Sequence, residues 1–174
     1  MNSIRKLEVV CEMDTLGQHY IVEASGCNPD IISSVSRVEE ILVKAAEVAG
    51  VQIWSISFHR FQPHGVSGVV VISESHLSVH TWPEYGYAAL DIYTCGKNSN
   101  PEAAVEYALE QFQAKSVHVT ECSRGLQEGD NIFFHSIVTW EEEIQDRATP
   151  ANLDEETEQK VKATVKALNG RKKA

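Results

Sequence analysis

The sequence lacks long apolar segments. No run of about 18 apolar residues occurs among its 174 residues, so no membrane-spanning helix is predicted. The apolar run at Val9 and Val10 is soon interrupted by Glu12 and Asp14, which does not fit the apolar core of a secretory signal peptide. We therefore expect a cytoplasmic protein without a membrane partner.

Basic residues are scarce. Lys and Arg together number 15 against 25 Asp and Glu, and the formal net charge is −10 at pH 7. Proteins that bind nucleic acid displace counterions from phosphates with clustered Lys and Arg, and the body of this chain has no such cluster. We therefore expect no nucleic-acid partner. The acidic balance mildly favours a cationic ligand, although solubility alone also explains it.

Cysteine and histidine patterns of metal sites are also missing. The four cysteines have no C-x-x-C spacing, which predicts free thiols rather than a zinc site or a disulfide framework; they are Cys11, Cys27, Cys95 and Cys122. The seven histidines include no H-x-x-x-H pair with an acidic partner. We therefore expect no metal.

The sequence does contain strand-like segments interrupted by two helix-like segments. A first helix is predicted from the capping-box pair Ser36 and Glu39 to Gly50, and a second begins at Asn100-Pro101. Short loops between strands favour a mainly antiparallel sheet with both helices on one face, an α+β layered sandwich. Strands are predicted at residues 18–25, 51–62, 68–73, 76–81, 87–95, 115–122 and 131–140.

A single domain is predicted for residues 1–140, because 174 residues suffice for one sizeable core and are few for two. The remaining segment, residues 141–174, is highly charged and ends in NGRKKA. It is interpreted as a solvated tail with a weak helix near residues 153–168, dispensable for chemistry.

Reactive side chains are concentrated between residues 67 and 95, on neighbouring predicted strands. Taken singly, each has an ordinary structural interpretation: Ser75 is typical of a turn, His80 of a structural histidine and Cys95 of a small buried side chain. Strands folded against each other could gather a hydroxyl, an imidazole, a carboxylate and a thiol in one site. Spacing alone does not identify the reaction.

Together these residues match a known family. Residues 58–96, FHRFQPHGVSGVVVISESHLSVHTWPEYGYAALDIYTCG, closely resemble the prokaryotic S-adenosylmethionine decarboxylase proenzymes. The resemblance extends more weakly to Leu16-Gly17-Gln18-His19 and to residues 117–121 (VHVTE), so it covers roughly residues 16–125. Gln18 replaces an expected basic residue, and Ala24-Ser25-Gly26 is smaller than the corresponding segment of relatives, which would reshape one wall of the pocket.

The resemblance implies that the chain cleaves itself between Glu74 and Ser75, into a β chain of residues 1–74 and an α chain of residues 75–174. The Ser75 hydroxyl would attack the Glu74 carbonyl to form an ester, and loss of the Ser75 α-proton would expel it. Hydrolysis of the resulting dehydroalanine would leave a pyruvoyl group. By similarity, His80 takes part in the proton abstraction and Ser67 donates a hydrogen bond to the intermediate.

The same resemblance implies that this covalent pyruvoyl group, rather than pyridoxal phosphate, is the cofactor. It would form a Schiff base with S-adenosylmethionine and accept electrons as CO₂ leaves, yielding decarboxylated S-adenosylmethionine for spermidine synthesis. Cys95 matches the family's proton donor, Glu84 the carboxylate that binds the ribose, and Phe61 the aromatic that stacks on adenine. Glu23 is a further substrate-site candidate. A homodimer of αβ units is expected, because the family site lies near a dimer interface.

Three alternatives remain open. The same pyruvoyl scaffold could decarboxylate another amino acid, such as arginine or ornithine, although Phe61 and Glu84 favour a substrate that carries a nucleoside. A regulatory homologue that does not cleave itself would typically have lost Ser75, His80 or Cys95, and this chain retains all three. A Ser/His hydrolase is disfavoured by the lack of a G-x-S-x-G nucleophile elbow.

Overall fold

The computed structural model describes residues 15–95 and 98–144. Seven strands form one antiparallel sheet in the order β2-β3-β4-β5-β1-β6-β7. The strands are β1 (Gly17–Ser25), β2 (Ile53–Phe61), β3 (Gly65–Ile72), β4 (Ser75–Trp82), β5 (Tyr87–Thr94), β6 (Ser116–Glu128) and β7 (Ile132–Glu143). The helices are α1 (Pro29–Ile32), α2 (Val35–Val48) and α3 (Pro101–Gln111), with a 3₁₀ turn, η1, at Pro83–Tyr85.

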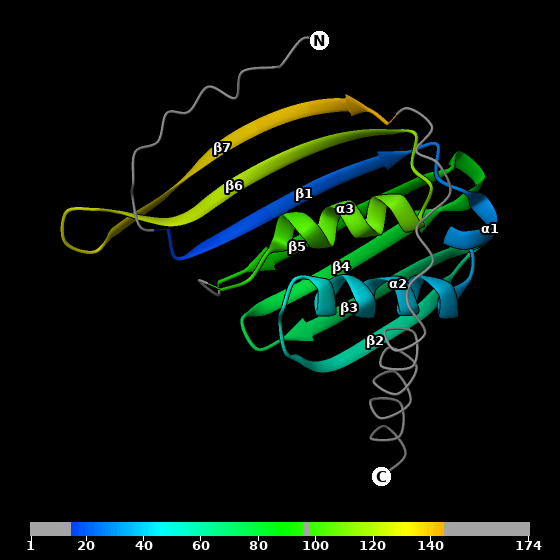
Figure 1. Ribbon diagram of the computed structural model, residues 1–174, viewed down its shortest axis with the longest axis horizontal. Coiled ribbons are helices and arrows are strands. Elements are labelled where there is room, and N and C mark those ends of the chain that lie inside the picture. Colours follow the sequence, from blue (N-terminus) through cyan, green and yellow to red (C-terminus); the bar gives the residue numbers. More distant parts are fainter. Residues whose placement is uncertain (1–14, 96–97, 145–174) are drawn as a thin grey trace.

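Both long helices lie on the same face of the sheet (Figure 1). Helix α2 covers β2 and β3, and α3 covers β1 and β5. This arrangement confirms the predicted α+β fold, a mainly antiparallel sheet with helices on one face. No helix in the described part of the chain is long and apolar enough to cross a membrane.

The helix starts differ in part from the sequence prediction. Helix α3 begins as predicted, because the Asn100 side chain accepts a hydrogen bond from the Ala103 N–H at 3.1 Å. The predicted capping box of α2 is wrong: the helix begins two residues earlier, where the Ser34 hydroxyl accepts the Arg37 N–H at 3.4 Å. Since Ser34 already satisfies an end donor, Ser36 lies inside the first turn.

Alternating burial along the strands separates a helix-covered face from an open face. On β5 the side chains of Ala88, Leu90 and Ile92 are buried under the helices, whereas Asp91 and Tyr93 lie on the other side. The same alternation buries the apolar side chains of β4 and leaves its histidines on the open face. Because successive strand residues point to opposite faces, the helix-covered face holds the core and the open face holds the reactive side chains.

A buried threonine connects the sheet to α1. The Thr81 side chain has no solvent exposure, accepts the Val66 N–H at 2.9 Å and donates its own proton to the Ile32 carbonyl at 2.7 Å. The hydroxyl is therefore fully paired, as a buried polar group must be. These bonds join β3, β4 and α1 just before η1 begins.

The last strand extends beyond its predicted end. β7 pairs with β6 as far as Glu143, opposite Ser116, and so enters the segment that the sequence assigns to a charged tail. Charged side chains suit an exposed edge strand, because they discourage pairing with other chains. The helix predicted near residues 153–168 lies outside the described residues.

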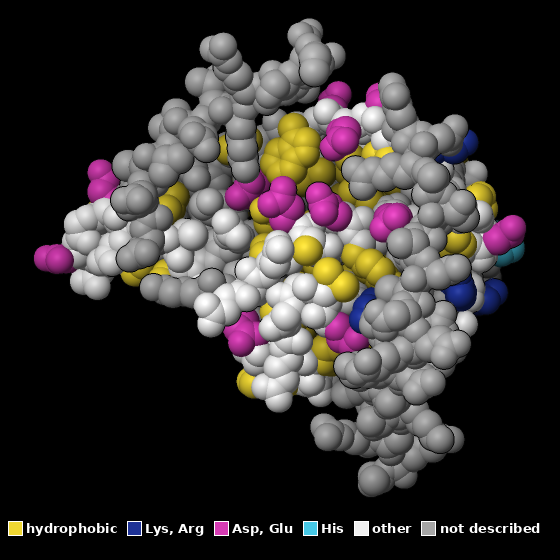
Figure 2. Space-filling view, in the orientation of Figure 1, with side chains coloured by type: hydrophobic (Ala, Val, Ile, Leu, Met, Phe, Trp, Pro, Cys, Tyr) yellow, Lys and Arg dark blue, Asp and Glu magenta, His cyan; other side chains and the backbone are white. Residues whose placement is uncertain are grey.

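Figure 2 shows the helix-bearing side of the molecule. Asp and Glu side chains are scattered over this face, whereas Lys and Arg form only a few small groups on the right side of the view. This distribution follows the excess of acidic over basic residues in the sequence. Acidic side chains therefore outnumber basic ones on the visible part of this face.

Candidate functional site

The residue predicted to be cleaved lies at a tight hairpin. β3 ends at Ile72 and β4 begins at Ser75, and these two residues pair across the turn. Ser75 has a φ of 154°, a positive value that residues other than glycine rarely adopt. Such a conformation stores strain, and the structure places it at the residue whose preceding peptide bond is predicted to break.

The Glu74 carbonyl is held by the end of the neighbouring strand. The Cys95 N–H donates a hydrogen bond to the Glu74 carbonyl oxygen at 3.2 Å. A donor in this position would stabilise negative charge that develops on that oxygen during attack. On the other side of the peptide bond, the Ser75 Oγ lies 3.2 Å from Nδ1 of His76. The carbonyl, the nucleophile and a proton acceptor are therefore in place together.

Tyr93 connects this hairpin to Cys95 and to β1. Its hydroxyl hydrogen-bonds the Cys95 side chain, which is the main reason that the Tyr93 pKa is raised. Its ring centroid lies 6.2 Å from that of His76 and 5.4 Å from that of His19. A Cβ on Gly17 would come within 2.9 Å of the Tyr93 hydroxyl, so a glycine is required there. We call Ser75, His76, Tyr93 and Cys95 the hairpin cluster.

A contact between a histidine and a carboxylate lies beside the hairpin cluster on the open face. Nε2 of His19 is 3.2 Å from a carboxylate oxygen of Asp91, whose second oxygen accepts from the Ser78 hydroxyl at 3.4 Å. The hydrogen bond from His19 is the largest of the effects that lower the Asp91 pKa. This pair links the middle of β5 to β1 and fixes the His19 ring next to Tyr93.

A second group of predicted site residues lies at the opposite end of β4. Ser67 and His80 face each other across β3 and β4, and the Ser67 Oγ is 2.9 Å from Nδ1 of His80. The His80 ring lies 6.4 Å from the Trp82 ring, and Trp82 stacks on Tyr87 at 5.0 Å. We call Ser67, His80, Trp82 and Tyr87 the distal cluster.

Two of the predicted substrate residues join the distal cluster. The Phe61 ring packs edge-on against Trp82 at 5.9 Å, and Gly65 leaves the space that this ring needs, since a Cβ there would lie 2.2 Å from it. Glu23 accepts a hydrogen bond from the Tyr87 hydroxyl. Burial, followed by this bond, raises the pKa of Tyr87 to about 12.

Glu84, the third predicted substrate residue, is exposed in η1, just beyond the end of β4. Its position after Pro83 places it at the same end of the strand as the distal cluster. Within the described part of the chain, no hydrogen bond joins its carboxylate to another predicted site residue. It therefore stands at the edge of the site, open to solvent.

The two clusters do not meet within one chain. Ser75 and His80 are the first and sixth residues of the same strand, which separates them by about 17 Å at roughly 3.3 Å per residue. Ser75 is level with Thr94 on β5, whereas His80 is level with Ala89. The structure therefore brings Glu74, Ser75 and Cys95 together, brings Ser67, His80 and Phe61 together, and keeps these two sets apart.

Several residues of both clusters were not predicted to belong to the site. His76 and Tyr93 in the hairpin cluster, and Trp82 and Tyr87 in the distal cluster, lie within the motif that carries the family resemblance but received no role. Strand alternation could have identified them as site residues, because His76 and His80 share one face of β4 and Tyr87 and Tyr93 share one face of β5. His19, also unassigned, reaches the site only through the pairing of β1 with β5.

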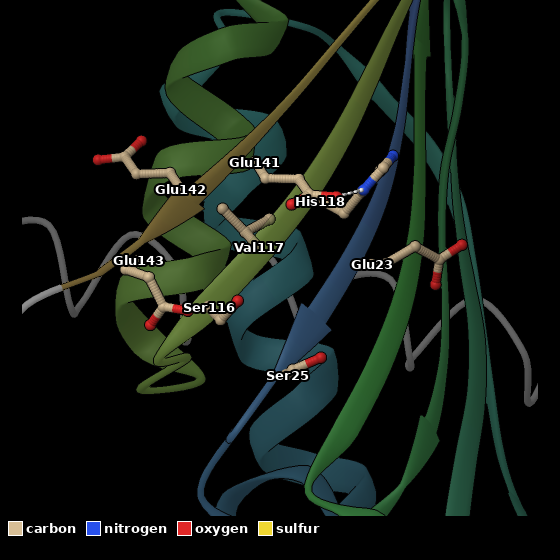
Figure 3. Close-up of a pocket in the computed structure, with 8 residues that line it drawn as sticks. All are labelled: Glu23, Ser25, Ser116, Val117, His118, Glu141, Glu142 and Glu143. Carbon is tan, nitrogen blue, oxygen red and sulfur yellow. Dashed lines mark hydrogen bonds and ion pairs between the residues drawn. The ribbon is translucent and has the colours of Figure 1, made fainter.

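A hollow of about 450 Å³ lies at the end of β1, β6 and β7 (Figure 3). Glu141, Glu142 and Glu143 line it from β7, and His118 pairs with Glu141 at 3.0 Å. The Glu23 side chain extends from β1 toward β5, away from the β7 carboxylates. The hollow is thus a separate acidic feature that borders the distal cluster through Glu23.

Three of the four cysteines lie in the described part of the chain, and all three are free thiols. Cys27 and Cys122 are buried free thiols and Cys95 is exposed, whereas Cys11 lies outside the described residues. Burial raises the pKa of Cys27 to about 12, which makes that thiol unreactive. Among residues 15–95 and 98–144, no group of three or more His, Cys, Asp or Glu side chains is arranged to hold a metal ion.

Comparison with known proteins identifies the family. A family model described as S-adenosylmethionine decarboxylase matches residues 18–125. The chain belongs to the S-adenosylmethionine decarboxylase family. The S-adenosylmethionine decarboxylase proenzyme of Pyrococcus furiosus is 53% identical over 135 residues, which cover 78% of this chain and 97% of the relative. That of Moorella thermoacetica is 54% identical over 116 residues, or 67% of this chain and 93% of the relative.

The fold agrees with a solved structure of the same family. The crystal structure of the adenosylmethionine decarboxylase from Aquifex aeolicus VF5 matches with a TM-score of 0.63 and 37% sequence identity. The match covers 68% of this chain and 98% of the other. The predicted resemblance to S-adenosylmethionine decarboxylase proenzymes is thereby confirmed. Both clusters lie inside the matched family segment, whereas β7 lies beyond it.

Proposed function

We propose that this chain is a self-processing, pyruvoyl-dependent S-adenosylmethionine decarboxylase that breaks its own backbone between Glu74 and Ser75. The observation that carries the proposal is the geometry at this bond: a serine with a positive φ follows a carbonyl held by the Cys95 N–H. Membership of a family whose relatives are named proenzymes agrees with it. The reaction then follows from the side chains around the hairpin.

Cleavage begins when the Ser75 Oγ attacks the Glu74 carbonyl carbon. A bond forms between that carbon and Oγ, and the bond to the Ser75 nitrogen breaks, which leaves an ester and a free amine. The Cys95 N–H stabilises the negative charge that the carbonyl oxygen carries during this step. Removal of the Ser75 α-proton then expels Glu74 as a carboxylate, and water releases ammonia from the dehydroalanine.

The residues around Ser75 fit the pyruvoyl group that this sequence of steps would leave. The new chain terminus would remain at the start of β4, with the exposed Cys95 thiol at the end of the adjacent strand. The bound group supplies a conjugated carbonyl that accepts the electrons released with CO₂. Cys95 returns a proton to the substrate carbon, and its bond to Tyr93 fixes the direction from which that proton comes.

We further propose that two copies of the chain complete each site. His80 and Ser67 are assigned to the processing of Ser75, yet about 17 Å of strand separates them from it in one chain. A two-fold axis over the open face would place the distal cluster of one copy on the hairpin cluster of the other. Both sites of a homodimer would then be equivalent, and each would contain residues of both chains.

The distal cluster is suited to the nucleoside part of the substrate. Phe61 and Trp82 present aromatic rings at its surface, on which an adenine could stack, and the positive sulfonium gains from aromatic faces. Glu84 is exposed at the rim, where its carboxylate can accept hydrogen bonds from ribose hydroxyls. Arginine and ornithine carry no nucleoside to contact these groups, so S-adenosylmethionine is the substrate that the site favours.

The remaining expectations from the sequence stay predictions. They are the cytoplasmic location, the lack of a nucleic-acid or membrane partner, the lack of a metal, and the extent of the domain over residues 1–140. The charged segment from 145 onward lies outside the described residues.

Intact-mass spectrometry of the purified protein tests the proposed function. We expect two fragments, residues 1–74 and a fragment from residue 75 whose mass corresponds to a ketone in place of the serine amine. Ser75→Ala should remain a single chain, whereas Cys95→Ala should still be cleaved but release CO₂ from carboxyl-labelled S-adenosylmethionine far more slowly. A whole wild-type chain with an unmodified Ser75 would contradict the proposal.

A further inference from the structure

His76 has no assigned role, although it lies directly at the reacting hydroxyl. Its Nδ1 is 3.2 Å from the Ser75 Oγ, within reach of a hydrogen bond from that hydroxyl. The His76 side chain is half-buried on the open face. The histidine to which processing was assigned, His80, lies about 17 Å further along the strand. His76 is therefore the imidazole nearest to the first bond that changes.

The His76 ring is positioned by aromatic neighbours on two other strands. Tyr93 on β5 meets it edge-on at 6.2 Å, and His19 on β1 meets it edge-on at 6.5 Å. His19 is itself fixed by its 3.2 Å contact with Asp91. These contacts restrict the imidazole plane, so that Nδ1 stays directed at the Ser75 hydroxyl.

We propose that His76 is the general base of the first cleavage step and transfers the Ser75 hydroxyl proton to the departing nitrogen. The inference rests on the proposed self-cleavage and extends it. Nδ1 accepts the proton as Oγ bonds to the Glu74 carbon, and then donates it to the Ser75 nitrogen as the peptide bond breaks. The proton count is unchanged, and His76 returns to its neutral form. His80 of the second copy acts only afterwards, on the α-proton.

The charged groups around His76 are compatible with a base. The negative Asp91 lies on the neighbouring strand and interacts electrostatically with His76, as the lowering of the Asp91 pKa reflects. Tyr93, whose pKa is raised, stays neutral, and His19 pairs with Asp91. Glu74 and Cys95 flank the hairpin itself. The Asp91 carboxylate therefore stabilises the cation that His76 becomes when it accepts the proton.

The test isolates the first step in a His80→Ala background, in which the chain should stop at the ester. Hydroxylamine cleaves an ester but not a peptide bond, so the rate of hydroxylamine-dependent cleavage on a denaturing gel reports ester formation. Freshly synthesised full-length chain is used, in a cell-free translation mixture. Adding His76→Asn keeps a hydrogen-bond acceptor near the Nδ1 position but removes the base. We expect a fall of about 100-fold or more, the usual effect of losing a general base.

Two further variants separate a base from a structural role. In His76→Ala, added imidazole should restore much of the lost rate, which a folding defect would not allow. His64→Asn changes an exposed histidine in the β2–β3 turn and should leave the rate unchanged.

The outcomes distinguish the two proposals. If wild type and His80→Ala behave as described but His76→Asn forms the ester at the same rate, His76 is not the base and self-cleavage stands. If His76→Ala is slow, imidazole does not help and His76→Asn is fast, the side chain serves only to position Ser75, which also overturns the inference. A wild-type chain that never cleaves at Ser75 overturns both.

Discussion

If each site is built from two copies, an inactive Ser75→Ala chain should restore cleavage of an inactive His80→Ala chain. His80→Ala keeps Ser75 but lacks the distal histidine, and Ser75→Ala has the opposite defect. Because about 17 Å of strand separates these residues, far beyond the roughly 3 Å of a hydrogen bond, His80 cannot serve Ser75 of its own chain without a large rearrangement. In a mixed dimer, one of the two sites would combine both intact residues.

The expected yield follows from random pairing. When the variants are co-expressed in equal amounts, about half of the His80→Ala chains pair with a Ser75→Ala chain, and only these can be cleaved. Different tags on the two chains let a denaturing gel follow the His80→Ala chain alone. Its cleavage should therefore rise from near zero to about one half.

The matched control places both defects in the same cluster. Co-expression of His80→Ala with Ser67→Ala leaves every site without one member of the Ser67–His80 pair, so the His80→Ala chain should gain nothing. If the Ser75→Ala partner gives no rescue although mixed dimers are recovered through both tags, the site lies within one chain. The division of roles between the two clusters would then be wrong.

Three further predictions concern stability and substrate binding. Thr81→Val leaves two buried backbone groups without their partner and should lower the free energy of unfolding by about 2 kcal/mol in urea titrations; an unchanged midpoint would contradict the hydrogen-bond assignment. The hydrogen bond from His19 lowers the Asp91 pKa. The stability that this bond gives the folded protein is therefore complete above the ordinary Asp pKa of 3.8 and is lost as the pH falls through the lower pKa of the folded state. Asp91→Asn should therefore be less stable than wild type near neutral pH and converge with it in acid, whereas a constant difference would exclude this linkage. Phe61→Leu removes the ring that packs against Trp82 and should raise KM for S-adenosylmethionine about 10-fold with self-cleavage retained, whereas an unchanged KM would remove Phe61 from the binding site.

Local sequence signals predicted most of the fold. The positions of the strands follow from runs of β-branched and aromatic residues, and α3 follows from Asn100 and Pro101 at its start. The start of α2 was misplaced because Ser34 and Ser36 offer similar caps, and only the structure shows which hydroxyl meets the Arg37 N–H. Helix α1 is a single turn, too short for a periodic pattern. Its signal was the Asn28 cap before Pro29.

The site was predicted less completely, because its parts depend on strand pairing. The family resemblance supplied the identities of Ser75, His80 and Cys95 but not their arrangement. His19 is 57 positions before His76 in the sequence, and β1 brings it to the same face only by pairing with β5. No local pattern carries that information, since the register between distant strands is set by packing of the whole sheet.

The separation of the two clusters, by contrast, follows from an elementary property of hairpins. In an antiparallel hairpin, residues face each other when they are equally far from the turn. Ser75 adjoins the turn between β3 and β4, so its partner is the nearby Ile72, whereas Ser67 and His80 face each other far from it. A short distance in sequence between Ser75 and His80 therefore means a long distance in space, because a strand is the most extended form of the chain. For that reason, the run of reactive residues on this hairpin divides into two separate groups, and the proposed two-fold axis is the simplest operation that would unite them.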